Sequence, residues 1–188
     1  MTLATAPSTV ATKWAIDPAH TNVEFAVKHL MISNVKGRFA EVTGTLEGDA
    51  TDPSTFDLDV NIDVASIDTR QAQRDAHLRS PDFFNADQWP SMRFTGKRVE
   101  NQNGDQFELV GDLTIRDVTR EITLDVTSEG SVTDPWGNSR IGFSARGKID
   151  RRDFGLTWNQ ALEAGGFVVG DQVKISVDVE FTAVADAS

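Results

Sequence analysis

The chain has 188 residues, of which 39% are hydrophobic, and this is enough for one domain with a substantial core. Asp and Glu outnumber Lys and Arg by 29 to 18, so the formal net charge is −11. A surface this acidic repels phosphate backbones and the sequence has no basic run, which argues against nucleic acid as a partner. The absence of cysteine excludes disulfides, thiolate nucleophiles and cysteine-based zinc sites.

The first residues, MTLATAPSTVATK, lack the basic start and the apolar core of roughly 7–15 residues that a secretory signal peptide has. No apolar stretch is long enough to span a bilayer. We therefore expect a cytoplasmic protein, or a periplasmic or secreted one if a leader has been removed. Residues 1–12 are small and polar and include Pro7, so we expect a disordered tail before a single domain over residues 13–185.

Most of the chain alternates apolar and polar residues with a period of two, which is typical of strands with one solvent-exposed face. Turn signals such as GDATDPS, NQNGDQ and TDPWGN separate the runs. Eight strands are predicted, centred on residues 23–27, 35–46, 56–64, 92–94, 107–115, 122–126, 141–145 and 173–181. Strands of this kind predict an antiparallel barrel or sandwich, and the period alone does not choose between the two.

The second predicted strand changes its pattern midway. Phe39 is apolar on one parity, whereas Val42 and Leu46 are apolar on the other. Such a switch is typical of an extra residue inserted in one strand of a pair. We therefore expect a β-bulge near Ala40 and Glu41 and a strong bend in this strand.

Residues 68–80, DTRQAQRDAHLRS, interrupt the period of two. The segment is rich in helix formers, contains neither Gly nor Pro, and is followed by Pro81. Asp68 and Gln71 have the spacing of a capping box, so a helical insertion is predicted here. Three basic residues would then share one face of the helix: Arg70, Arg74 and His77.

Three histidines are the candidates for acid–base chemistry near neutral pH: His20, His29 and His77. His20 follows Asp17 and His77 follows Asp75, so either imidazole could be a general base oriented by a carboxylate. A metal site built from the three histidines is a second alternative, and structural or ligand-contacting roles are a third. The spacing matches no metal-ligand motif, and hydrolase, P-loop and dinucleotide-binding signatures are absent. We therefore predict no catalytic residue and no metal site.

Four segments in order resemble the YceI-like family: WAIDPAHTNVEFAVKHLMISNVKGRF, RDAHLRSPDFFN, LTIRDVTREITLDV and RRDFGLTW. The resemblance extends from about Trp14 to Ala183. It implies an all-β fold, an extended eight-stranded antiparallel lipocalin-like β-barrel with a helical insertion near residues 68–80 and an elongated apolar cavity. It also implies a non-enzymatic binder of polyisoprenoids, isoprenoid quinones or other long-chain amphiphilic lipids, with a homodimer as one expected state and no cofactor besides the lipid.

The predicted ligand-binding residues are inward-facing apolar residues of the strands, residues of the segment 74–85, and one later tryptophan. They are Phe25, Val27, Phe39, Val42, Arg74, His77, Leu78, Phe83, Phe84, Phe94, Leu113, Phe143 and Trp158. At the barrel mouth, Arg74, His77 or Arg79 would meet a polar or anionic head group. In the alternative interpretation, Arg74 and Asp75 form structural ion pairs that hold the insertion on the barrel.

Two other functions stay open at this point. An enzyme acting on a lipid or small ester would use His20 or His77 as its base, with substrate turnover and a bell-shaped pH profile. An interaction or stress-related module would work through its outer or dimer surface. That module would have a filled barrel without a ligand-sized cavity.

Overall fold

The computed structural model describes residues 12–184. Its strands are β1 (Thr12–Ile16), β2 (Asn22–His29), β3 (Ser33–Phe39), β4 (Val42–Gly48), β5 (Asp57–Asp63), β6 (Ile67–Asp68), β7 (Ser91–Asn103), β8 (Gln106–Ile115), β9 (Val118–Thr133), β10 (Ser139–Asp150) and β11 (Val169–Ala183). Its helices are α1 (Ala72–Arg79) and the 3-10 helices η1 (Pro18–His20), η2 (Pro53–Thr55), η3 (Val64–Ser66) and η4 (Arg151–Phe154). None of these helices is long and apolar enough to cross a membrane.

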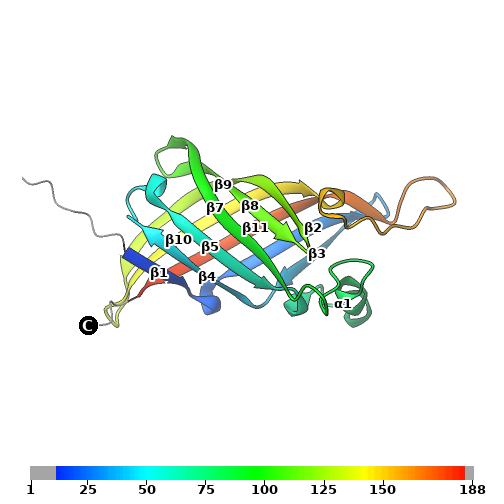
Figure 1. Ribbon diagram of the computed structural model, residues 1–188, viewed down its shortest axis with the longest axis horizontal. Helices are drawn as coiled ribbons and strands as arrows, with labels where there is room; N and C mark the ends of the chain where they lie inside the picture. The colour runs from blue at the N-terminus through cyan, green and yellow to red at the C-terminus, as the bar shows by residue number, and fades with distance from the viewer. Residues whose placement is uncertain (1–11, 185–188) are drawn as a thin grey trace, which may run out of the picture.

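The strands form one antiparallel barrel, which closes because β1 pairs with both β4 and β11 (Figure 1). Three of its strands are each interrupted once. β1 and β2 are two parts of one strand, because both pair with β11. β3 and β4 are likewise two parts of the next strand, which pairs with β2 through β3 and with β5 through β4. β5 and β6 form the third interrupted strand, in which β6 pairs with β3. Counted this way, the eleven segments make up eight strands, and the predicted eight-stranded antiparallel barrel is confirmed.

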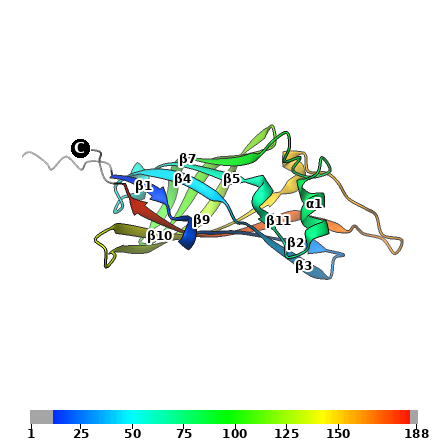
Figure 2. The ribbon, with the colours of Figure 1, turned by 90° about the horizontal axis from the view of Figure 1, so that it is seen from below.

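The barrel is long, and its two ends differ. Figures 1 and 2 show α1, the β2–β3 turn and the segment 155–168 together at one end, which we call the mouth. The start of β1 and the β9–β10 turn lie at the opposite end, which we call the far end. The helical insertion therefore lies at one opening of the barrel, where the sequence analysis placed it.

The second predicted strand is irregular at the expected place, but by a complete break instead of the β-bulge that was predicted. β3 ends at Phe39 and β4 begins at Val42, so Ala40 and Glu41 belong to neither strand. Both Phe39 and Val42 are buried, at 7% and 5% exposure. The break thus absorbs the switch of parity and keeps the apolar side chains of both halves in the barrel interior.

The helical insertion begins later than predicted. The N-cap of α1 is Gln71, whose side-chain oxygen accepts a hydrogen bond from the backbone N–H of Arg74. Asp68 instead lies in β6, and its carboxylate accepts from the backbone N–H of Arg70. Arg70 precedes the helix and has a φ of 62°. The predicted capping box and the basic face that included Arg70 are therefore wrong, because strand pairing in β6 keeps Asp68 extended.

The disordered tail expected over residues 1–12 lies outside the described residues except for its last member. Thr12 is already the first residue of β1 and pairs with Gly48. Regular structure therefore begins one residue before residue 13, the predicted start of the domain. Residue 185, the expected end of the domain, also lies outside the described residues.

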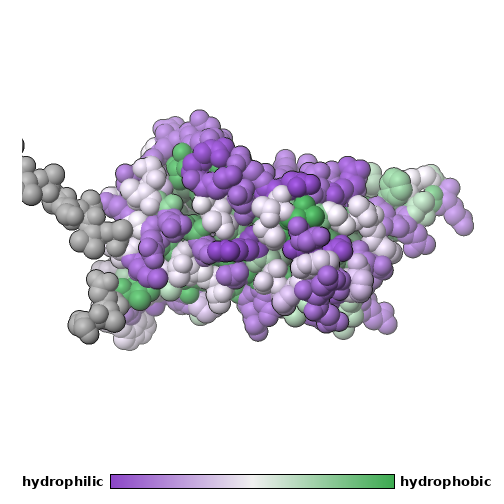
Figure 3. Space-filling model, in the orientation of Figure 1, coloured by the Kyte–Doolittle hydropathy of each residue, from purple (hydrophilic) through white to green (hydrophobic). Residues whose placement is uncertain are grey.

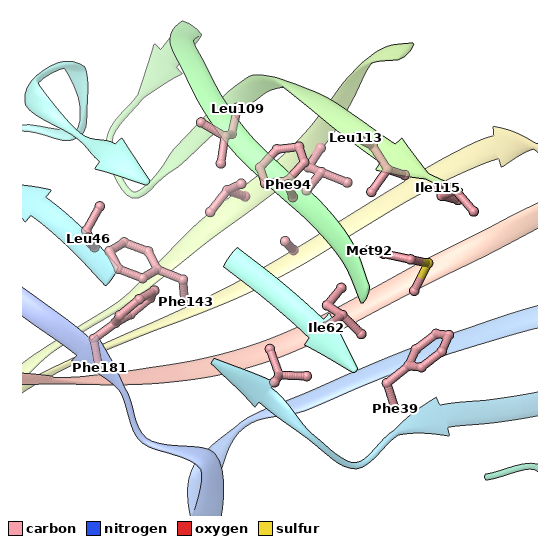
Figure 4. Close-up of a cluster of buried hydrophobic side chains, with 14 of the residues drawn as sticks. Phe39, Leu46, Ile62, Met92, Phe94, Leu109, Leu113, Ile115, Phe143 and Phe181 are labelled. Carbon is pink, nitrogen blue, oxygen red and sulfur yellow. The ribbon is translucent and has the colours of Figure 1, made fainter. Parts of the chain in front are cut away.

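The core of the molecule is the barrel interior. Alternate residues of the strands point inward, so apolar side chains from opposite walls meet (Figure 4). Phe143 lies edge to face with Phe107 and with Phe181, at centroid distances of 6.3 and 6.2 Å. The outward residues of the same strands are polar, which explains the period of two in the sequence.

Candidate functional site

The barrel interior contains a cavity of about 250 Å³. Its lining includes Leu46 and Phe181 toward the far end and Phe84 and Val169 at the mouth, so it extends along the barrel. The lining residues are apolar apart from three: Thr21, Glu24 and Arg151. A cavity with carbon walls favours an apolar ligand.

The residues predicted to bind the ligand fall into two groups. The apolar ones on the strands, on α1 and just after it line the cavity: Phe25, Val27, Phe39, Val42, Leu78, Phe83, Phe84, Phe94, Leu113 and Phe143. This placement follows from strand geometry, because residues two apart on a strand share one face. The other three predicted residues do not line the cavity: Arg74, His77 and Trp158.

Arg74 and Asp75 both bind Thr69, which precedes α1. The guanidinium of Arg74 donates from Nε to Thr69 Oγ1 at 2.7 Å and from Nη2 to the Thr69 carbonyl at 2.8 Å. The carboxylate of Asp75 accepts from the backbone N–H of Thr69 at 2.9 Å and from its hydroxyl at 2.5 Å. Thr69 and Asp75 are buried. These contacts fix α1 to the residue that follows β6, so Arg74 and Asp75 have a structural role, but through Thr69 instead of the ion pairs that the structural alternative expected.

Arg79 makes the same kind of contact at the end of the helix. Its Nε donates to the carbonyl oxygen of Ala65 at 3.0 Å, and its Nη2 donates to that of Ile67 at 2.9 Å. Each bond joins α1 to the segment that runs into β6. The basic side chains of the insertion are thus largely occupied by the chain itself.

His77 lies behind the cavity wall and contacts a different carboxylate from the one expected. Its Nε2 is 2.8 Å from Oδ2 of Asp82, whereas the predicted partner, Asp75, binds Thr69. The imidazole packs edge-on against Phe83 and Trp158, at centroid distances of 5.1 and 4.7 Å. Because Phe83 lines the cavity, His77 and Trp158 support the mouth from outside.

The sequence analysis missed Arg151, a polar residue that lines the cavity at the mouth. It lies in η4 and is 4% exposed. Its guanidinium donates to four backbone carbonyls, those of Gly170, Leu156, Trp158 and Val169, at 2.8, 2.5, 2.9 and 3.4 Å. Burial lowers the pKa of Arg151, and the carboxylate of Asp171 opposes that effect. The motif RRDFGLTW contains Arg151, but two adjacent arginines give no sign of which one is buried.

A separate ionic cluster surrounds Arg140 on β10. Its Nε donates to Asp134 at 2.7 Å, and its Nη1 donates to Asp17 at 2.7 Å and also contacts Glu180. His20 Nδ1 lies 2.9 Å from the same Asp17 oxygen. The cluster therefore binds η1, which interrupts the first strand, to β10 and β11.

Asp17, His20 and Glu180 are near enough to one another to share a metal ion. Among residues 12–184, no other group of three His, Asp or Glu side chains is this close. The guanidinium of Arg140 already contacts both carboxylates and occupies the oxygens that a metal ion would need. Hydrogen bonds from His20 and Arg140 lower the pKa of Asp17 to about 2, and Asp17 raises the pKa of His20. The three histidines of the sequence do not come together as a site in this part of the chain.

Comparison with known proteins confirms the resemblance found in the sequence. The model of the YceI-like domain matches residues 14–181. A UPF0312 protein of Staphylococcus aureus strain MSSA476 is 40% identical over 172 residues, which cover 91% of this chain and 98% of that protein. The crystal structure of the Campylobacter jejuni YceI protein is 36% identical with a TM-score of 0.72, over 84% of this chain and 90% of that chain.

A more distant solved structure shares the fold. It is a polyisoprenoid binding domain from Saccharophagus degradans implicated in plant cell wall breakdown. The two chains are 16% identical with a TM-score of 0.67, over 91% of this chain and 98% of the domain. At this level of identity the likeness shows the fold alone.

Proposed function

Because the chain belongs to the YceI-like family, we propose that it binds one polyisoprenoid, isoprenoid quinone or other long-chain amphiphilic lipid inside the barrel without converting it. The observation that carries this proposal is the cavity of about 250 Å³ with its almost wholly apolar lining. A long, narrow, carbon-lined space suits a hydrocarbon chain better than a polar metabolite.

The expected affinity follows from the hydrocarbon that such a cavity removes from water. Each buried CH₂ group contributes roughly 0.8 kcal/mol. About ten such groups give on the order of 8 kcal/mol before the cost of ordering the chain, which corresponds to micromolar binding or better. The Saccharophagus degradans domain is described as polyisoprenoid binding. We take from it only that a barrel of this fold suits such a ligand.

The positions of the histidines support binding over catalysis. Neither His20 nor His77 lines the cavity, so the reacting group of an enclosed lipid would not meet either imidazole. Each of the two lies within hydrogen-bond distance of a carboxylate, that of Asp17 or that of Asp82. The cavity itself counts against an interaction module with a filled barrel.

Native mass spectrometry of freshly purified protein, followed by solvent extraction, tests the proposal. We expect a mass increment of one long-chain lipid per chain, or stoichiometric uptake of an added prenyl lipid by emptied protein. Val177→Phe places a ring in the cavity and should lower occupancy at least tenfold. Ser176→Phe, on the adjacent outward position of β11, is the matched control. A protein that is empty and takes up no prenyl lipid would contradict the proposal.

A further inference from the structure

The mouth carries exposed apolar side chains on two segments that lie side by side. Met31 and Ile32, in the β2–β3 turn, are 63% and 83% exposed, and Phe167, just before β11, is 55% exposed. The backbone N–H of Leu30 donates to the carbonyl of Val168 at 2.9 Å, which joins the two segments. We call Met31, Ile32 and Phe167 the apolar tip; Figure 3 shows apolar residues projecting at this end.

Four exposed lysines occupy the wall that leads to the apolar tip, and none of them forms an ion pair with another residue of the range 12–184. They are Lys28, Lys36, Lys148 and Lys174, which we call the lysine patch. Ala26 of β2 pairs with Lys36 on one side and with Lys174 on the other, and Lys174 pairs with Lys148. Three of the lysines thus form one row across four adjacent strands, and Lys28 lies two residues nearer the tip on the same face.

The lysine patch is not explained by the stability of the barrel. Lys148 and Lys174 are direct cross-strand partners, and like charges in that position are destabilising. Lys13 and Lys97, elsewhere on the barrel, do form ion pairs with carboxylates. Asp150 and Asp171, at the mouth end of the patch, bind Arg152, and Asp178 binds Arg146. Glu24, two residues from Ala26 on the same face, accepts a hydrogen bond from Asn22 and forms no ion pair with a lysine of the patch. The patch therefore keeps unneutralised positive charge on a protein whose net charge is −11.

We propose that the mouth docks on an anionic phospholipid surface, with the apolar tip in the interfacial region and the lysine patch against the head groups. Apolar side chains beside basic ones are the combination that binds such surfaces. The net charge repels an anionic surface only within a screening length of about 8 Å at physiological salt, so the local patch decides the contact. Docking in this orientation would place the mouth of the cavity beside the bilayer. Membrane docking is a separate property from the binding of a lipid in the cavity.

Vesicle co-sedimentation of the full chain tests the charge half of the proposal. We expect binding to vesicles of phosphatidylcholine mixed with phosphatidylglycerol, weakened by added salt, and much less binding to phosphatidylcholine alone. One lysine near an anionic surface is worth roughly fivefold in binding, so the double change Lys148→Gln and Lys174→Gln should weaken it on the order of 25-fold. The control, Lys13→Gln with Lys97→Gln, alters net charge equally and should leave binding unchanged.

The apolar half has its own matched pair of variants. Ile32→Ser with Phe167→Ser should weaken binding to the mixed vesicles at least tenfold. Val132→Ser with Trp136→Ser removes side chains that are 64% and 82% exposed at the far end, and it should have no effect. Glu163, exposed on the segment that carries Phe167, opposes docking. Its replacement by Gln should therefore strengthen binding.

Several results would overturn the proposal: no sedimentation with mixed vesicles, equal binding to neutral vesicles, or equal loss in the patch and control variants. A self-associating protein that Ile32→Ser with Phe167→Ser makes monomeric, and that does not bind vesicles, would assign the mouth to a second copy of the chain. Uptake of prenyl lipid by each variant, measured without vesicles, separates a failure of docking from a failure of the cavity.

Discussion

Arg140 and Asp17 are 123 residues apart in the chain, yet Nη1 of the arginine donates to the aspartate at 2.7 Å. The same side chain binds Asp134 of the β9–β10 turn and Glu180 of β11. A single guanidinium thus joins η1 to the strands beside it. Since η1 interrupts the first strand, Arg140 replaces the strand hydrogen bonds that this interruption removes.

Arg140→Gln is expected to lower the free energy of unfolding of the barrel, because three carboxylates would lose their shared cation while only partly exposed. Chemical denaturation at neutral pH measures the loss. Arg120→Gln is the control, because among residues 12–184 the Arg120 side chain donates only to the carbonyl of its neighbour Thr119. Equal stability of the two variants would show that the cluster does not hold the interruption closed.

The same cluster predicts that stability falls both at acidic pH, through Asp17, and at alkaline pH, through His20. The pKa of Asp17 is lowered from 3.8 to about 2, so its contribution is present above pH 3.8 and is lost as the pH falls through 2. The pKa of His20 is raised above 6.5, so its contribution is complete below pH 6.5 and is lost as the pH rises through the raised value.

Unfolding curves between pH 5 and 9 measure the part of this pH dependence that is due to His20, because Asp17 stays ionised over that range. We expect the stability of wild type to decline above pH 6.5 and His20→Gln to remove this decline. Asp17→Asn should remove the same decline, because His20 then has no hydrogen-bonded carboxylate. An unchanged decline in both variants would assign the pH dependence to other groups.

Arg74→Ala separates the two roles considered for the helical insertion. Because Arg74 binds Thr69 through two hydrogen bonds, we expect the free energy of unfolding to fall by about 1–3 kcal/mol. The affinity for a prenyl lipid should change little, because Arg74 does not line the cavity. Arg70→Ala, an exposed position just before α1, is the control. Weaker lipid binding with unchanged stability would instead support the head-group role first inferred from the sequence.

Arg151→Ala should loosen the segment 155–168 at the mouth. The change leaves the carbonyls of Leu156, Trp158 and Gly170 without their donor, and unsatisfied buried groups cost about 1–3 kcal/mol each. Limited proteolysis should cut this segment faster than in wild type. Arg151→Lys should rescue little, because an ammonium group does not present the planar fork of a guanidinium. Unaltered cleavage in Arg151→Ala would contradict this role.

The sequence by itself determined the strands and their inward faces. Residues such as Phe25 and Phe94 could be assigned to the interior because side-chain direction in a strand depends only on the alternation of neighbours. The break between Phe39 and Val42 was visible for the same reason, as a local change of parity. Most of the apolar lining of the cavity follows from these local patterns, and Leu78, Phe83, Phe84 and Leu156 add to it from outside the strands.

Only the tertiary structure decided which polar side chains meet. Pairing of β6 with β3 moved the start of α1 past Asp68, and burial selected Arg151 over Arg152. The contact between Arg140 and Asp17 and the row of Lys36, Lys174 and Lys148 depend on the register of strands far apart in sequence. The alternation of apolar and polar residues along one strand does not depend on how that strand is aligned with its neighbours. It therefore shows which side chains face the cavity, but not which side chains of neighbouring strands meet.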